Sequence, residues 1–91
     1  MRASLAAREA LSYLQTGPDA FVLHFDVDVT NLSAADVHHA RGLDLAPAFA
    51  ALKVFLASSA CAGVVVTEFN AEKDKDGSAA ASLVDGLVES F

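Results

Sequence analysis

The chain has 91 residues, of which 54% are hydrophobic and 20% are charged. This length allows one domain and excludes two separate cores, and the composition excludes an intrinsically disordered chain. Six basic residues against twelve acidic ones give a formal net charge of −6. The sequence has no basic patch that could neutralise phosphates, which argues against nucleic acid as a partner.

Residues 4–15 carry apolar side chains at helical spacing, which predicts a helix that Gly17 and Pro18 end. Residues 21–28 alternate between two faces and predict a strand. Both faces are rich in apolar residues up to Asp26, which favours a buried parallel strand.

The spacing of leucine and phenylalanine predicts a second helix over residues 45–58. Three consecutive valines favour a second strand over residues 63–69. An apolar stripe predicts a last helix over residues 79–90, capped by Ser78. Within it, Gly86 costs about 1 kcal/mol relative to alanine, so we expect the end of this helix to fray.

The order helix, strand, helix, strand, helix predicts an α/β fold in which a right-handed crossover joins two parallel strands. Ligands of such sheets bind beyond the carboxyl ends of the strands. Both predicted strands carry polar residues there: Asp26 and Asp28 on the first, Glu68 and Asn70 on the second. We call these four residues the polar edge, and we expect them to lie close together.

Asp26 and Asp28 would share one face of the strand at about 6–7 Å from each other, with Glu68 within reach on the neighbouring strand. Crowded carboxylates repel one another unless a cation compensates their charge. Their oxygens suit magnesium or manganese. The alternative is that the two aspartates only end the strand and solvate the following loop.

The other polar residues have simpler interpretations. His24 could join a metal site, but we favour a packed histidine with one hydrogen bond. His38 and His39 are adjacent and cannot easily share one site, so we expect both to be solvated. Asp74 and Asp76 belong to a charged loop and are expected to face solvent.

The two motifs resemble those of the ureohydrolase family, the arginase and agmatinase group of dinuclear-manganese hydrolases. The stretch LHFDVDVTNL is similar to the family's strand ending in S-F-D-[IV]-D, and Asp26 and Asp28 match its two metal-binding aspartates. The stretch VVVTEFNA is similar to the family's E-x-N-P motif. Glu68 matches the glutamate that contacts the guanidinium end of the substrate, and Asn70 matches the asparagine, so the resemblance makes both substrate-binding residues.

The resemblance covers nearly the whole chain. Gly42 and Leu43 are similar to the glycine–leucine pair before the family's intervening helix. The sequence departs from the family at Asn31 and Leu32, where the family has aspartate and proline, and Ala71 replaces the proline of the second motif.

This resemblance implies a three-layer αβα fold of the arginase type with a parallel sheet, in which residues 1–91 form the C-terminal portion and the N-terminal half is absent. It implies manganese-dependent hydrolysis of a C–N bond in a guanidino or amidino substrate, in which metal-activated hydroxide attacks the guanidinium carbon. The complete family site holds two manganese ions. The family's motifs G-G-D-H and D-A-H-x-D have no match here. We therefore expect a partial metal site, no catalytic residue beyond it, and no turnover by this chain alone.

Two other functions stay open. The stretch FDVDVT also fits D-x-D-x-T, the first motif of haloacid-dehalogenase-like phosphatases. Asp26 would then be the nucleophile and Asp28 the general acid/base, with magnesium bound, although Val29 replaces the usual glycine. Thr67 ends a stretch similar to that family's second motif. Alternatively, the chain is a non-catalytic assembly module.

We expect either self-association or pairing with a complementing N-terminal chain, because an open sheet edge tends to pair with another strand. Cys61 is the only cysteine, so an internal disulfide is excluded. Arg8 and Glu9 stand where a signal peptide needs an unbroken apolar run, and no apolar run approaches the roughly 18 residues of a membrane span. These features predict a cytoplasmic protein without membrane contact.

Overall fold

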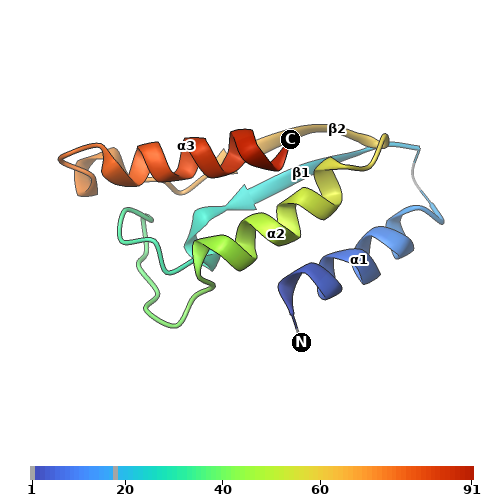
Figure 1. Ribbon diagram of the computed structural model, residues 1–91, viewed down its shortest axis with the longest axis horizontal. Coiled ribbons are helices and arrows are strands. Elements are labelled where there is room, and N and C mark those ends of the chain that lie inside the picture. The colour runs from blue at the N-terminus through green and yellow to red at the C-terminus, as the bar shows by residue number, and fades with distance from the viewer. Residues whose placement is uncertain (1, 18) are drawn as a thin grey trace.

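The computed structural model describes residues 2–17 and 19–91, with helices and strands in the predicted order (Figure 1). Pro18, part of the predicted stop signal, lies outside these residues. The elements are α1 (Ala3–Leu14), β1 (Phe21–Asp26), α2 (Leu45–Leu56), β2 (Cys61–Thr67) and α3 (Ser78–Ser90). Short 3₁₀ turns follow the two strands, η1 over Val27–Val29 and η2 over Ala71–Lys73.

The strands β1 and β2 form a two-stranded parallel sheet, which confirms the predicted α/β class. Phe25 lies opposite Val66, and both side chains point to the inner face of the sheet, toward the helices. The outer face carries Val22 and Val65, whose side chains are 61% and 49% exposed. The described part of the chain therefore leaves this outer face open to solvent.

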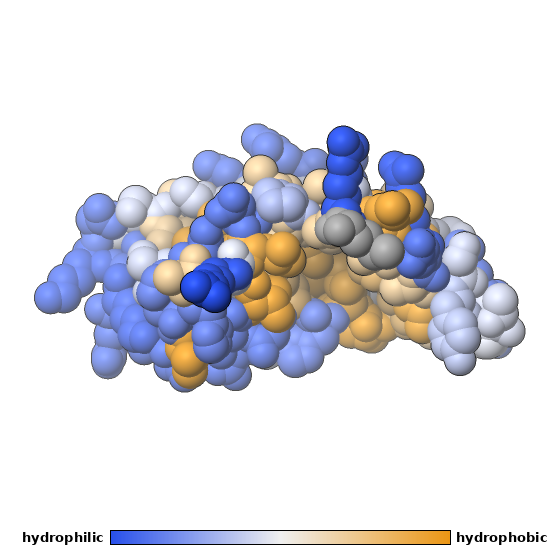
Figure 2. Space-filling view, turned by 90° about the horizontal axis from the view of Figure 1, so that it is seen from below, coloured by the Kyte–Doolittle hydropathy of each residue, from blue (hydrophilic) through white to orange (hydrophobic). Residues whose placement is uncertain are grey.

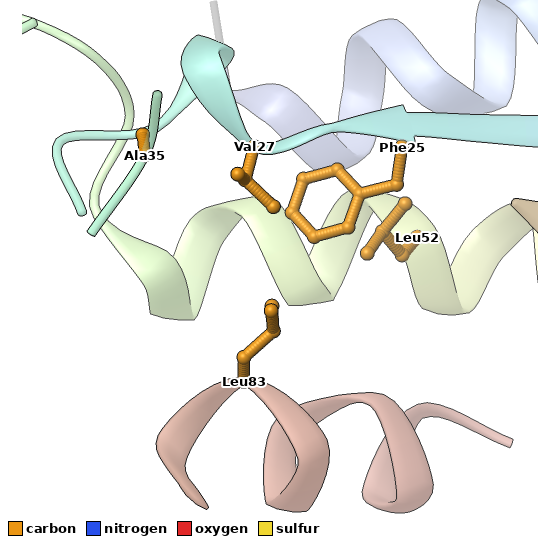
Figure 3. Close-up of a cluster of buried hydrophobic side chains, with 5 residues drawn as sticks. All are labelled: Phe25, Val27, Ala35, Leu52 and Leu83. Carbon is orange, nitrogen blue, oxygen red and sulfur yellow. The ribbon is translucent and has the colours of Figure 1, made fainter. Parts of the chain in front are cut away.

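The core lies between the inner face of the sheet and the helices α2 and α3 (Figure 3). Phe25 at the end of β1 and Val27 in η1 are almost fully buried, and they meet Leu52 of α2 and Leu83 of α3. The ring of Phe25 also packs edge-on against Phe49 of α2, with 6.3 Å between the ring centroids. Such a pair adds about 0.5–1.5 kcal/mol beyond area burial. The end of β1 therefore holds both helices.

The helix α1 packs against α2, on the side away from α3 (Figure 1). Its one buried residue is Ala7, and its exposed face includes Leu5 and Tyr13. Among the described residues, we find no helix with the length and apolar character needed to cross a membrane.

The first strand is shorter than the predicted 21–28. The Oδ1 atom of Asp26 accepts the backbone N–H of Asp28 at 2.9 Å, and this bond begins the turn η1. Side-chain bonds of this kind compete with strand geometry, so the chain leaves the sheet at Asp26. The strand β2 likewise begins and ends two residues before the predicted 63–69.

Carboxylates of the preceding loop, and not Ser78, cap the start of α3. The two carboxylate oxygens of Asp74 accept the N–H groups of Ala79 and Ala80, each at 2.9 Å. Asp76 accepts the backbone N–H of Ser78 at 3.0 Å, and this bond lowers the pKa of Asp76 below its ordinary value. Asp76 faces solvent as predicted, whereas the prediction for Asp74 is wrong, because that side chain is half-buried.

Gly86 lets α3 approach α2 closely. A Cβ at this position would overlap the ring of Phe49, so an alanine here would have to displace that ring. The helix continues to Ser90, whose hydroxyl donates to the carbonyl oxygen of Gly86 at 2.7 Å. The structure thus continues α3 past Gly86 to Ser90.

We predict that Gly86→Ala lowers the free energy of unfolding, measured by urea denaturation. The gain in helix propensity of about 1 kcal/mol is smaller than the cost of overpacking against Phe49, typically about 1–3 kcal/mol. The loss should shrink in a Phe49→Leu background, where the ring is absent. An alanine variant at least as stable as the original chain would contradict this packing.

We predict that Asp74→Ala lowers the free energy of unfolding by about 0.5–2 kcal/mol, because α3 loses its N-terminal cap. Glu72→Ala is the matched control, since Glu72 is an exposed carboxylate in the same loop, and it should change the free energy by less than about 0.5 kcal/mol. Equal effects of the two substitutions would mean that the cap contributes nothing.

Candidate functional site

The two strands end at the same edge of the sheet. Asp26, the last residue of β1, lies opposite Thr67, the last residue of β2, and Glu68 follows directly. Hydrophilic residues crowd this end of the molecule, at the left of Figure 2, while hydrophobic residues gather nearer the middle. The parallel pairing thus brings the predicted polar edge together at the level of the backbone.

The chain that follows β1 returns to this edge and interlocks with the chain that follows β2. The backbone N–H of Asp36 donates to the carbonyl oxygen of Glu68 at 2.6 Å. The N–H of Asn70 donates to the carbonyl oxygen of Ala34 at 2.7 Å. These two bonds lie on either side of an antiparallel bridge between Ala35 and Phe69. The two loops therefore form one unit, in which residues distant in sequence are held by backbone bonds.

Asp26 and Asp28 are both half-buried, and each uses a carboxylate oxygen to hold the backbone. Asp26 begins the turn η1 through the N–H of Asp28, and Asp28 accepts the N–H of Val37 at 3.0 Å. Asp28 lies in the turn and not on the strand, so the predicted placement of both carboxylates on one strand face is wrong. Among the residues that the structure describes, the second carboxylate oxygen of each has no hydrogen bond.

The backbone of Glu68 has a φ of 67°, in the left-handed region that residues with a Cβ atom rarely adopt. Its side chain is exposed at the end of β2. Unusual backbone conformations of this kind cluster at functional sites. The carbonyl oxygen of Glu68 also accepts the N–H of Asp36, so this conformation belongs to the junction of the two loops.

Asn70 organises the second loop. Its side-chain oxygen accepts the N–H of Glu72 at 3.0 Å, and its side-chain nitrogen lies 3.4 Å from a carboxylate oxygen of Asp36. The ammonium group of Lys73 donates to the carbonyl oxygens of Ala35 and Asp36 at 3.2 and 2.7 Å. Sequence analysis missed Asp36 and Lys73, because no local pattern places their segments side by side.

Gly42 is required by a close approach between two backbone segments. A Cβ at this position would lie 2.5 Å from the carbonyl carbon of Thr30. Leu43 pairs with Thr30 in a short parallel bridge, and its N–H donates to the carbonyl oxygen of Val29 at 2.9 Å. This bridge extends the pairing beyond the end of β1 and limits where the loop between β1 and α2 can run.

His24 shares the outer face of β1 with Asp26, and no histidine in the described part of the chain belongs to a group of three side chains that could hold a metal ion. The Nε2 atom of His24 lies 2.7 Å from the hydroxyl oxygen of Thr67, on the exposed outer face of the sheet. The predicted single hydrogen bond is present, but the ring is exposed and not packed. His38 and His39 are exposed as predicted, and the Nδ1 atom of His38 lies 3.3 Å from the carbonyl oxygen of Leu32.

Residues 2–17 and 19–91 contain no group of three or more His, Cys, Asp or Glu side chains that could hold a metal ion. Asp26 and Asp28 supply carboxylate oxygens, which manganese and magnesium prefer. Either ion, however, takes about six ligands in octahedral geometry. The type of donor fits the predicted metal, but the number of donors does not make a complete site.

Comparisons of this chain with models of known protein families, with curated proteins and with solved structures find no match.

Proposed function

We propose that this chain is the C-terminal portion of a ureohydrolase-like domain, which hydrolyses a C–N bond of a guanidino or amidino substrate with manganese. The observation that supports this most is the parallel pairing of β1 with β2, because it brings Asp26, Asp28, Glu68 and Asn70 to one edge of the sheet. Ligands of parallel sheets bind beyond this edge. The ligands that this chain lacks would come from another polypeptide segment.

The residues of this chain have separate roles in the proposal. Asp26 and Asp28 hold the turn and the loop with one carboxylate oxygen each and offer the other oxygen to manganese. A bound metal ion supplies an activated water near neutral pH. The exposed carboxylate of Glu68 accepts charge-assisted hydrogen bonds from a guanidinium group. Asn70 accepts the N–H of Glu72, which holds the loop beside Glu68, and in the proposal it contacts the same substrate.

The open outer face of the sheet supports the proposal of a three-layer arginase-like fold. Val22 and Val65 are exposed there, whereas parallel sheets usually carry helices on both faces. The segment that completes the metal site would also supply the second layer. A cytoplasmic location belongs to the same proposal, since a reducing compartment suits the lone Cys61.

We predict that manganese binds weakly to this chain and that paramagnetic broadening affects the amide signals of residues 26–28 first. Asp26→Asn and Asp28→Asn keep an oxygen that can accept the backbone N–H, but each removes a charged ligand. Each should weaken manganese binding by at least the roughly 10–100-fold that loss of an outer-shell partner costs. Titration followed by electron paramagnetic resonance measures the affinity.

Asp76→Asn is the matched control, because it removes one charge from a carboxylate that also accepts a backbone N–H. It should leave manganese affinity unchanged. If all three asparagine variants weaken binding equally, manganese responds only to the net negative charge and the proposed site is absent. In that case the non-catalytic assembly module becomes the better interpretation.

One observation favours the phosphatase alternative. Thr67 lies directly opposite Asp26 at the ends of the paired strands, where the second motif of such a phosphatase would stand beside its nucleophile. The hydroxyl of Thr67 is, however, within hydrogen-bond distance of His24. In the part of the chain that the structure describes, no lysine stands free beside Asp26 to support that chemistry, since the ammonium group of the nearby Lys73 is held by two backbone carbonyl oxygens.

We predict that acetyl phosphate and magnesium do not phosphorylate Asp26, because the ureohydrolase proposal makes this residue a metal ligand and not a nucleophile. Peptide mass spectrometry after incubation would detect a phosphoryl adduct, and Asp26→Asn is the control for its position. An adduct on Asp26 that disappears in this variant would replace our proposal with the phosphatase.

A further inference from the structure

The ammonium group of Lys73 reaches from the loop after β2 to the backbone of the loop after β1. It donates to the carbonyl oxygen of Asp36 at 2.7 Å and to that of Ala35 at 3.2 Å. Glu72 and Asp74 flank Lys73 in the sequence, yet its charge is directed to carbonyl groups of a segment 37 residues away. The positive charge of Lys73 is thus fixed at one particular point of the first loop.

The peptide group at this point contacts Asp28 from its other side. The carbonyl group of Asp36 and the N–H of Val37 belong to the same peptide bond, which is trans, so they point in opposite directions. The carbonyl oxygen accepts from Lys73, and the N–H donates to the Oδ1 atom of Asp28 at 3.0 Å. One planar peptide group therefore connects a positive side chain to a negative one through two hydrogen bonds.

The two charges strengthen each other's hydrogen bond across this peptide group. The ammonium group draws electron density toward the carbonyl oxygen, which makes the N–H of Val37 a stronger donor to the carboxylate. Hydrogen bonds in a chain polarise one another in this way, and bonds with an ionised partner are stronger than neutral ones. The orientation of the Asp28 carboxylate therefore depends on the charge of Lys73, although a peptide group separates the two side chains.

Asn70 and Glu68 hold the two ends of this contact in place. The side-chain oxygen of Asn70 accepts the N–H of Glu72, and its carbonyl oxygen accepts the N–H of Lys73 at 3.1 Å. Asn70 thus begins the turn η2, which carries Lys73. On the side of the first loop, the N–H of Asp36 donates to the carbonyl oxygen of Glu68. The residues that follow β2 therefore fix both the lysine and the peptide group that it contacts.

We propose that Lys73 is a positioning residue, which orients the carboxylate of Asp28 through the peptide group between Asp36 and Val37. The Oδ1 atom of Asp28 is held on the loop, so that Oδ2 points in a defined direction. The use of Oδ2 by manganese rests on the proposed function, whereas the orientation of the carboxylate rests on the hydrogen bonds alone. Residues that orient metal ligands in this way commonly set the affinity for the metal.

The amide proton of Val37 reports this orientation directly in NMR spectra. We predict that Lys73→Met, which removes the charge and keeps an unbranched side chain, shifts this proton upfield, because its hydrogen bond to Asp28 weakens. The shift should be smaller in an Asp28→Asn background, where the acceptor has no charge. Lys73→Arg keeps a cation with several donors and should restore most of the original signal position.

Lys75→Met is the matched control, because Lys75 is an exposed lysine of the same loop, and it should leave the Val37 signal unchanged. The dispersion of the remaining amide signals checks that each variant folds. An unchanged Val37 signal in Lys73→Met would overturn the proposal. A shift of equal size with and without the charge of Asp28 would also overturn it, because Lys73 would then only hold the loop.

Manganese affinity is a second test, in which charge and positioning predict opposite signs. Removing a positive charge near a cation site strengthens binding by simple electrostatics, whereas loss of a partner that orients a ligand weakens it by roughly 10–100-fold. We therefore predict weaker manganese binding by Lys73→Met, and unchanged or slightly tighter binding by Lys75→Met, in titrations followed by electron paramagnetic resonance.

The two tests separate this role of Lys73 from the proposed function. If Asp28→Asn weakens manganese binding while Lys73→Met strengthens it as Lys75→Met does, the metal site stands and the positioning role is overturned. If Asp28→Asn leaves the affinity unchanged, the proposed function fails, and the Val37 signal still decides whether Lys73 orients Asp28.

Discussion

The parallel pairing of β1 with β2 is the constraint on which the rest of the molecule depends. Parallel neighbours need a crossover between them, and α2 supplies it. The register directs Phe25 and Val66 to the same face, where Leu52 and Leu83 complete the core. Because the strands run in the same direction, both end at one edge, and the residues that follow them have to share that edge. The core and the candidate site thus result from one register.

The order and type of the elements could be predicted because each has a strong local pattern. The helices have apolar side chains that recur with a period of 3.6 residues, and the second strand has a run of three valines. Both patterns are visible in the sequence alone. The end of β1 could not be predicted, since a single bond from Asp26 to the N–H of Asp28 ends the strand. The role of Gly86 was equally hidden, because it depends on Phe49, which lies on another helix.

The candidate site could be predicted only at the level of the backbone. Parallel strands with polar ends are enough to place Asp26 and Glu68 at one edge. The bonds that interlock the two loops, through Asp36 and Lys73, join segments more than thirty residues apart, with no sequence signal. The carboxylates also turned out to hold the backbone, so one set of residues serves the structure and the proposed chemistry together.

The left-handed backbone of Glu68 has a consequence for any relative or redesigned form of this chain. For a residue with a Cβ this conformation costs roughly 1–2 kcal/mol, and glycine adopts it freely. Selection for stability alone would favour glycine at position 68. Glutamate at this position supplies a carboxylate and makes the fold less stable than glycine would. A sequence of this fold with glycine at position 68 would therefore have a less strained backbone at the end of β2, and it would lack the carboxylate there.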